Sequence, residues 1–328
     1  MPHIKYIRDI LYIMVKNKIK RILPLIVGII ILAYIPIILD TEKILELLFR
    51  IKIEYFLLAT VFYFLIEITV AIILRISIEG AGKISIISLL LSHMCGMLYG
   101  YATPGRVGYY YVAFSLGKKL KISRSEIIGI LTVFQGLNFF IKIILCMIAV
   151  AYFSTYLISD ESKLYLILVS LSPIIAVIGV ILSLYTDIAN RIFSRISFLR
   201  FIVEYIERMQ RSSRTLSKEK ILKMAFLVFF GWFLMSAQFL FIAFSLNIVN
   251  IDYINALMLQ PLLTTITFVP ISPAGLGVAE GGSSILFKII GLTLENGVAF
   301  MLLVRFNSII VDSIGLIDMR TYRRSNVS

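Results

Sequence analysis

The chain has 328 residues, of which 59% are hydrophobic, and its mean hydropathy is +0.96. These values exclude a soluble globular domain. The formal net charge is +13, but the basic residues lie mostly in connections between apolar runs. Cytoplasmic loops of membrane proteins collect Lys and Arg, so this charge indicates membrane topology and gives no reason to expect a nucleic-acid partner. The composition predicts an all-α, polytopic integral membrane protein.

Six apolar runs reach or approach the ~20 residues that a helix needs to cross the hydrocarbon core. They are Ile22–Leu39, Tyr55–Leu74, Ile127–Phe153, Leu164–Tyr185, Met224–Leu246 and Gly297–Ile317. Two further apolar regions, Ile84–Gly117 and Tyr253–Gly291, are each cut by a Pro/Gly-rich loop into halves that are mostly too short to span. The sequence therefore predicts six spanning helices and two broken-helix regions.

The two loops share a pattern. They read Thr103-Pro104-Gly105-Arg106-Val107-Gly108 and Ser272-Pro273-Ala274-Gly275-Leu276-Gly277. Each has a small hydroxyl residue, a proline and two glycines. Broken helices are tolerated at membrane depth only where they are buried in protein or line a cavity. Paired interruptions in corresponding positions of two halves indicate a transport site.

The distribution of Lys and Arg predicts how the chain is threaded. Basic residues before the first span, in Lys118–Arg124 and in the connection 186–223 all lie on the cytoplasmic side if the region 84–117 dips in from that side and returns. The region 253–291 then dips in from outside. We therefore expect one membrane domain over residues 1–328 in the cell membrane, with both termini cytoplasmic. Its halves, 1–163 and 164–328, would form an inverted repeat with two re-entrant hairpins.

The connection 186–223 is strongly basic, and apolar residues alternate in it with Arg and Glu at near-helical spacing. This pattern is typical of an amphipathic helix that lies on anionic headgroups. A solvated cytoplasmic helix that merely fixes orientation accounts for the pattern equally well, and we place no site there.

Four ionisable residues lie at the predicted membrane depth: Glu67, Arg106, Glu280 and Arg305. A charged side chain there costs several kcal/mol, so each of these residues is a candidate for a functional role. Arg106 has two interpretations. It could bind an anion such as a lipid phosphate, together with the N-terminus of the following half-helix, or it could lie nearer the cytoplasmic surface as one more topological cation. Glu280 suits the N-terminus of the second half-helix, and it is the natural partner for Arg305. That pair could be structural or could rearrange during transport.

Other polar residues carry weaker signals. Gln135 and Asn138, one helical turn apart, could line a transport path or form interhelical hydrogen bonds. Glu67 has no obvious local partner, and His93 is interpreted as a packing residue. Three ionisable residues are interpreted as snorkelling or lying near an interface: Lys142, Lys288 and Asp312.

The second loop and its surroundings, Pro270 to Glu280 followed by Arg305, resemble the membrane region of lysylphosphatidylglycerol synthases. This flippase-like family includes the multiple peptide resistance factor and stand-alone members. The first loop is similar to the family's N-terminal motif, although Tyr109 stands where an acid is usual. The family's Glu-Arg and later Asp in the next helix map onto Phe134, Gln135 and Asn138. A basic residue is also common at the position of Ala279.

The resemblance covers nearly the whole chain and implies lipid translocation between leaflets. The aminoacyl-transferring synthase domain is absent, so the chain itself is not expected to make lysyl-lipid. The predicted transport residues are Pro104, Gly105, Arg106, Gly108, Gln135, Asn138, Ser272, Pro273, Gly275, Gly277, Glu280 and Arg305.

The leading hypothesis is a flippase or transporter for a phosphate-containing lipid, either a phospholipid or a polyprenyl-phosphate glycolipid. One alternative is an intramembrane enzyme or an accessory subunit of glycan-lipid or aminoacyl-lipid synthesis. Another is an ion-coupled small-solute transporter, which Glu67 and Asp312 facing one cavity would support. The sequence shows no catalytic or metal-binding constellation, so we expect no enzymatic activity, metal or cofactor. Expected partners are anionic membrane lipids, with a separate lipid-modifying enzyme or a homo-oligomer as further options.

Overall fold

The computed structural model describes residues 40–79, 82–103, 106–154, 216–267 and 275–318, with single positions at 167, 174, 177, 178, 182, 186, 207, 210, 211 and 272. The described elements are helices, with no strand among them, which confirms the all-α prediction. The predicted span Ile22–Leu39 lies outside the described residues. Apart from single positions, so do the span Leu164–Tyr185 and the basic connection up to residue 215.

Four described helices are long and apolar enough to cross a membrane. They are α3 (Ile53–Ser77), α6 (Arg124–Ser154), α10 (Lys218–Ser245) and α13 (Leu294–Asp312), the last continued by the short helix η3 (Ser313–Gly315). The four spans that the sequence predicts at 55–74, 127–153, 224–246 and 297–317 are confirmed as long apolar helices. The chain is a multi-pass membrane protein.

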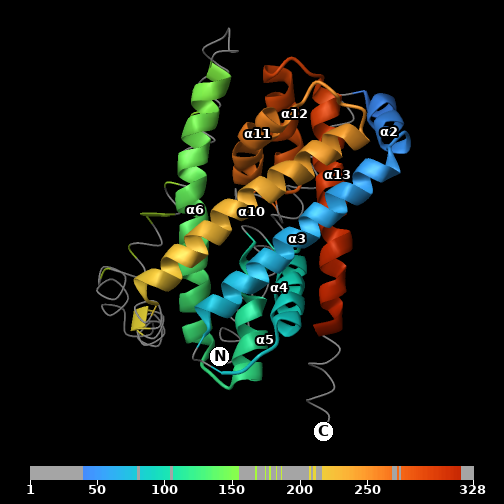
Figure 1. Cartoon of the computed structure of the whole chain (residues 1–328). Helices are drawn as coiled ribbons and strands as arrows, with labels where there is room; N and C mark the ends of the chain where they lie inside the picture. Colours follow the sequence, from blue (N-terminus) through green and yellow to red (C-terminus); the bar gives the residue numbers. More distant parts are fainter. Residues whose placement is uncertain are drawn as a thin grey trace, which may run out of the picture.

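Both Pro/Gly-rich regions form short helices on either side of a loop. The first contains α4 (Ile86–Tyr101), η1 (Val107–Tyr110) and α5 (Tyr111–Leu120), and the second contains α11 (Tyr253–Ile266) and α12 (Val278–Ile289). Each of these helices is shorter than the ~20 residues of a full span. The predicted breaks are therefore present. In Figure 1, α4 and α5 lie towards the lower end of the molecule, and α11 and α12 lie towards the upper end.

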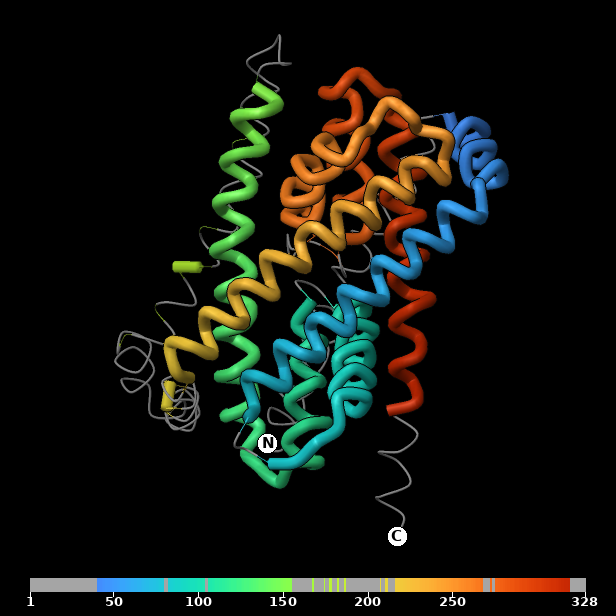
Figure 2. Tube along the Cα trace, viewed as in Figure 1, coloured from blue at the N-terminus to red at the C-terminus, as the bar shows by residue number. Residues whose placement is uncertain are grey.

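Helices α3 and α10 pack side by side and cross the molecule diagonally, with α6 on one flank and α13 on the other (Figures 1 and 2). Helices α12 and α13 approach closely through small residues. A Cβ atom on Gly297 would lie 2.6 Å from the Ser284 Cα atom, and the Ser283 Oγ atom donates a hydrogen bond of 2.8 Å to the Gly297 carbonyl. Small residues let membrane helices pack backbone to backbone.

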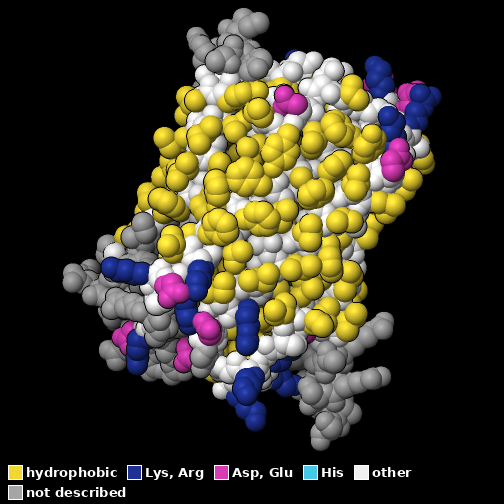
Figure 3. Space-filling model, in the orientation of Figure 1, with side chains coloured by type: hydrophobic (Ala, Val, Ile, Leu, Met, Phe, Trp, Pro, Cys, Tyr) yellow, Lys and Arg dark blue, Asp and Glu magenta, His cyan; other side chains and the backbone are white. Residues whose placement is uncertain are grey.

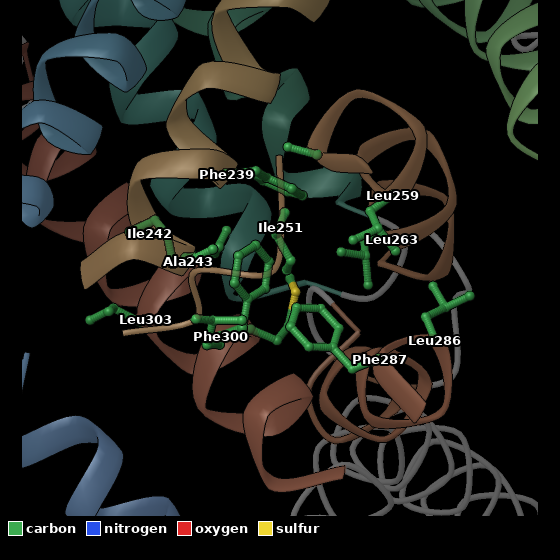
Figure 4. Close-up of a cluster of buried hydrophobic side chains, with 14 of the residues drawn as sticks. Phe239, Ile242, Ala243, Ile251, Leu259, Leu263, Leu286, Phe287, Phe300 and Leu303 are labelled. Atoms are coloured by element: carbon green, nitrogen blue, oxygen red, sulfur yellow. The ribbon is translucent and has the colours of Figure 1, made fainter. Parts of the chain in front are cut away.

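A buried apolar cluster joins α10, α11, α12 and α13 (Figure 4). The Phe300 ring lies 5.3 Å from the Phe239 ring and 5.0 Å from the Phe287 ring, measured between centroids. Leu259 and Leu263 of α11 belong to the same cluster. Aromatic packing of this kind holds the second broken-helix element against two long helices.

The surface view in Figure 3 shows hydrophobic side chains over the broad middle of the molecule and charged side chains towards its ends. Exposed apolar residues on the long helices, such as Leu57, Phe140 and Phe226, suit contact with lipid. At one end lies α2 (Thr41–Phe49), a short helix that precedes α3. Asp40 is the N-cap of this helix, and its Oδ1 atom accepts a hydrogen bond from the Lys43 amide.

Candidate functional site

A cavity of about 310 Å³ lies between the two halves of the structure. Helices α3, α4, η1 and α6 contribute lining residues from the first half, and α10, α11 and α13 contribute them from the second. Arg106 brings the first loop to the cavity, and Thr264 and Thr267 bring the end of α11. Both broken-helix elements therefore border the same space.

Two cationic side chains, Arg106 and Lys142, line this cavity. Lys142 is only 2% exposed, so the prediction that it snorkels to an interface is wrong. Its Nζ atom lies 5.3 Å from the centroid of Phe139 and 5.6 Å from that of Trp232. The Arg106 guanidinium lies 5.4 Å from the centroid of Tyr101. Aromatic faces stabilise these cations where water is scarce.

The first loop holds Arg106 by local hydrogen bonds. The Gly108 amide donates to the Thr103 Oγ1 atom at 2.7 Å, and the Arg106 amide donates to the Thr103 carbonyl at 3.2 Å. Arg106 has φ of +56°, a left-handed conformation that is costly for a residue with a side chain. A Cβ atom at Gly108 would clash with the Tyr99 carbonyl oxygen. Pro104 and Gly105 lie outside the described residues.

The second loop is closed in a similar way. The Ser272 Oγ atom donates a 2.7 Å hydrogen bond to the Leu276 carbonyl, so a hydroxyl residue at the start of each motif holds its loop to the backbone. Gly275 has φ of +70°, and a Cβ atom there would lie 2.9 Å from the Cα atom of Thr267, which lines the cavity. Gly277, with φ of +78°, begins α12. Pro273 lies outside the described residues.

The predicted pair of Glu280 and Arg305 is confirmed. The Arg305 Nη2 atom lies 2.8 Å from the Glu280 Oε1 atom. The other carboxylate oxygen, Oε2, accepts a 2.7 Å hydrogen bond from the Gly277 amide. Glu280 is fully buried. The residues that line the cavity include neither member, so the pair joins α12 to α13 without bordering the cavity.

Gln135 and Asn138 line the cavity, as a transport path requires. The sequence analysis did not single out Gln238 and Gln260, which also line the cavity. The Gln238 Nε2 atom donates to the Asn307 Oδ1 atom at 2.9 Å, and the Asn307 Nδ2 atom donates to the Oγ1 atom of Thr60 at 2.7 Å. This buried chain ties α10, α13 and α3 together beside the cavity.

Glu67, on α3, has a partner that the sequence did not reveal. Its Oε2 atom lies 3.0 Å from the His93 Nε2 atom on α4. The His93 Nδ1 atom lies 3.1 Å from the hydroxyl of Tyr109 in η1. The interpretation of His93 as a packing residue is therefore incomplete. Tyr109 stands at the position where an acid was expected from the family pattern, and all three side chains line the cavity.

A second buried acid, Asp312, lies next to this group. Its Oδ2 atom accepts a 3.0 Å hydrogen bond from the Tyr63 hydroxyl, and the hydroxyls of Tyr63 and Tyr101 are 3.4 Å apart. Both tyrosines line the cavity. Asp312 is fully buried, so the snorkelling prediction is wrong for it. Lys288 is exposed near the end of α12, as that prediction requires.

These observations define a polytopic helical membrane protein with a cation-containing cavity between two broken-helix elements. The chain matches the family model described as the lysylphosphatidylglycerol synthase TM region over residues 22–315, most of its length, and it belongs to that family. The resemblance inferred from the second loop is thus confirmed, and the family indicates a membrane lipid-related function. No curated protein and no solved structure matches the chain.

Proposed function

We propose that this protein moves a lipid with a phosphate-containing headgroup between the leaflets of the cell membrane. The observation that carries the proposal is the presence of Arg106 and Lys142 in one cavity that both broken-helix elements border. A guanidinium binds phosphate oxygens bidentately, and a buried ammonium adds a second charge-assisted contact. Gln135 and Asn138 offer neutral hydrogen bonds to the rest of the headgroup, while the acyl chains stay in lipid.

The arrangement of the broken helices supports alternating access. Helices α4 and α5 lie at one end of the molecule and α11 and α12 at the other (Figure 1). We infer that they are re-entrant hairpins that enter from opposite faces, within six spans arranged as an inverted repeat. Opening one hairpin at a time would expose the cavity to one leaflet and then to the other.

The distribution of charged residues supports an assignment of which end of the molecule faces the cytoplasm. The basic ends of α5 and α10 both lie at the lower end of Figure 1. Lys118, Lys119, Lys220 and Lys223 belong to these ends. The opposite end, around α2, carries both signs (Figure 3). The positive-inside rule then makes the lower end cytoplasmic, with both termini on that side.

Transport of a small soluble anion is the second candidate. A volume of about 310 Å³ corresponds to roughly ten water molecules at ~30 Å³ each, which suits a phosphate headgroup or a free anion. Glu67 lines the same cavity, as expected for an ion-coupled carrier. Neither candidate assigns a catalytic step to the chain.

The test is lipid exchange in proteoliposomes. Acyl-labelled phosphatidylglycerol is followed by quenching of the label in the outer leaflet, and soluble phosphate uptake is measured in parallel. Removing one charge-assisted contact is worth about 1.5–3 kcal/mol, so Arg106→Gln and Lys142→Met should each slow exchange by about 10- to 100-fold. Lys288→Met, which removes an exposed lysine on α12, is the matched control and should exchange lipid at the native rate.

Three outcomes would count against the proposal. Native protein that exchanges lipid no faster than empty liposomes overturns it. If Lys142→Met and Lys288→Met exchange lipid at equal rates, the cavity cations have no part in transport. Phosphate uptake without lipid exchange selects the second candidate.

A further inference from the structure

Tyr109, His93 and Glu67 form a chain of polar contacts on one wall of the cavity. Both imidazole nitrogens are engaged, Nε2 by the Glu67 carboxylate at 3.0 Å and Nδ1 by the Tyr109 hydroxyl at 3.1 Å. The three side chains are 2%, 3% and 5% exposed for Glu67, His93 and Tyr109. They also line the cavity, so a proton can reach the chain from the space that would hold the headgroup.

This chain can gain or lose one proton while both contacts are kept. When His93 is neutral with its proton on Nε2, the Nε2–H group donates to Glu67 and the Tyr109 hydroxyl donates to Nδ1. When a proton is added at Nδ1, the imidazolium donates on both sides, and the Tyr109 oxygen becomes the acceptor. Only the Tyr109 hydroxyl hydrogen turns, and no bond between heavy atoms is made or broken. Histidine is the side chain that titrates near physiological pH.

The charged and titratable groups around the chain come from several elements. Asp312 of α13 accepts a hydrogen bond from the Tyr63 hydroxyl of α3, next to this chain. Helix α10 carries its charged residues in its first two turns, away from this site. The Lys119–Asp318 ion pair contacts Ser92, the neighbour of His93 in α4. The remaining groups are Tyr101 of α4, Tyr110 of η1 and Lys142 of α6.

An anion that contacts Arg106 and Lys142 brings negative charge into a site of low dielectric, where charges interact strongly. A proton on His93, in the wall of the same cavity, attracts that anion. Anion binding and proton binding therefore favour each other, and the coupling acts equally in both directions.

We propose that the Glu67–His93 pair is a proton-binding site, and that one proton binds together with each anionic headgroup. The proton is taken from water in the cavity onto the His93 Nδ1 atom and is returned when the headgroup leaves. The inference rests on the proposed function and adds its coupling ion, so a proton gradient would drive lipid towards the more alkaline side.

Histidine NMR offers a direct test, because the sequence contains only two histidines, His3 and His93. A His3→Ala protein purified with a histidine-free tag and labelled with ¹⁵N-histidine reports on His93 alone. A pH titration of its ring nitrogen signals shows whether and where His93 takes up a proton. Saturating glycerol phosphate, used as a soluble headgroup, should raise the midpoint by about one pH unit, a tenfold gain in proton affinity.

Variants separate the proton site from the headgroup site. Glu67→Gln should lower the His93 midpoint by removing the carboxylate that stabilises the imidazolium, and Tyr109→Phe, which keeps the ring, provides a second variant in case Glu67→Gln does not fold. Arg106→Gln should abolish the effect of glycerol phosphate and leave the ligand-free titration in place.

The outcomes can be told apart. A His93 that keeps one protonation state throughout, in the native protein and in Glu67→Gln, overturns the proton site. A midpoint unaffected by glycerol phosphate, in protein that exchanges lipid, overturns the coupling and leaves the proposed function standing. A His93 that titrates as expected in protein that exchanges no lipid overturns the proposed function and supports the proton site.

Discussion

The Glu280 carboxylate is contacted at both oxygens: the Arg305 Nη2 atom lies 2.8 Å from Oε1 as an ion pair, and the Gly277 amide donates a 2.7 Å hydrogen bond to Oε2. One side chain thus pairs with the last spanning helix and caps the helix that follows the second loop. The Arg305 side chain is 15% exposed and that of Glu280 is fully buried. Each therefore depends on the other for its neutralisation.

Replacing Glu280 with Gln should destabilise the protein strongly. The amide oxygen can still accept the Gly277 hydrogen bond, but the Arg305 charge loses its partner, at a cost of about 3–5 kcal/mol. Thermal unfolding in detergent measures the change. The control is Glu219→Gln, which breaks the exposed Glu219–Lys223 pair and should alter stability by no more than about 0.5 kcal/mol. Equal losses of stability in the two variants would show that the buried ion pair contributes no more than the exposed one.

Two glycines of the second hairpin should respond in opposite ways to Ala. At Gly275, φ is +70° and a Cβ atom would lie 2.9 Å from the Thr267 Cα atom, so Gly275→Ala should distort the cavity wall and lower the unfolding temperature. Gly281, inside α12, has nothing within 4 Å of the position that a Cβ atom would take. Gly281→Ala should be neutral or stabilise by up to about 1 kcal/mol. A Gly275→Ala protein as stable as native would contradict the close approach.

Asp318 should hold the end of the last helix against the first hairpin. Its carboxylate accepts hydrogen bonds from Lys119 and from the Ser115 Oγ atom, the latter at 2.7 Å. Asp318→Asn should expose the C-terminal end of this helix to proteolysis, because a buried charge-assisted bond is worth about 1.5–3 kcal/mol. Limited proteolysis compares it with Glu79→Gln, which removes the partner of Lys220 in a mostly exposed ion pair of 3.5 Å. Unchanged cleavage in Asp318→Asn would rule out the anchoring role.

Hydropathy and local chemistry predicted much of this structure. Four long apolar helices and two broken regions followed from the length of apolar runs and from Pro and Gly. The Glu280–Arg305 pair followed because a helix N-terminus favours a carboxylate and because both charges are too costly to leave alone in a membrane.

The rest depends on how the helices pack, which a single sequence does not contain. Tyr63 and Asp312 meet across 249 positions, and Glu67 meets His93 only because α3 packs on α4. Whether Lys142 faces lipid or the cavity is decided by the rotation of α6 about its own axis. The hydropathy of the sequence is the same for both orientations, so it cannot distinguish them.

Headgroup binding by the cavity cations is the central claim, and equilibrium binding of short-chain phosphatidylglycerol to purified protein tests it most directly. Native protein and Lys288→Met should bind with the same affinity. Arg106→Gln combined with Lys142→Met should bind at least about 100-fold more weakly, since two charge-assisted contacts are lost. Equal affinity in the double variant and in the native protein would contradict the account.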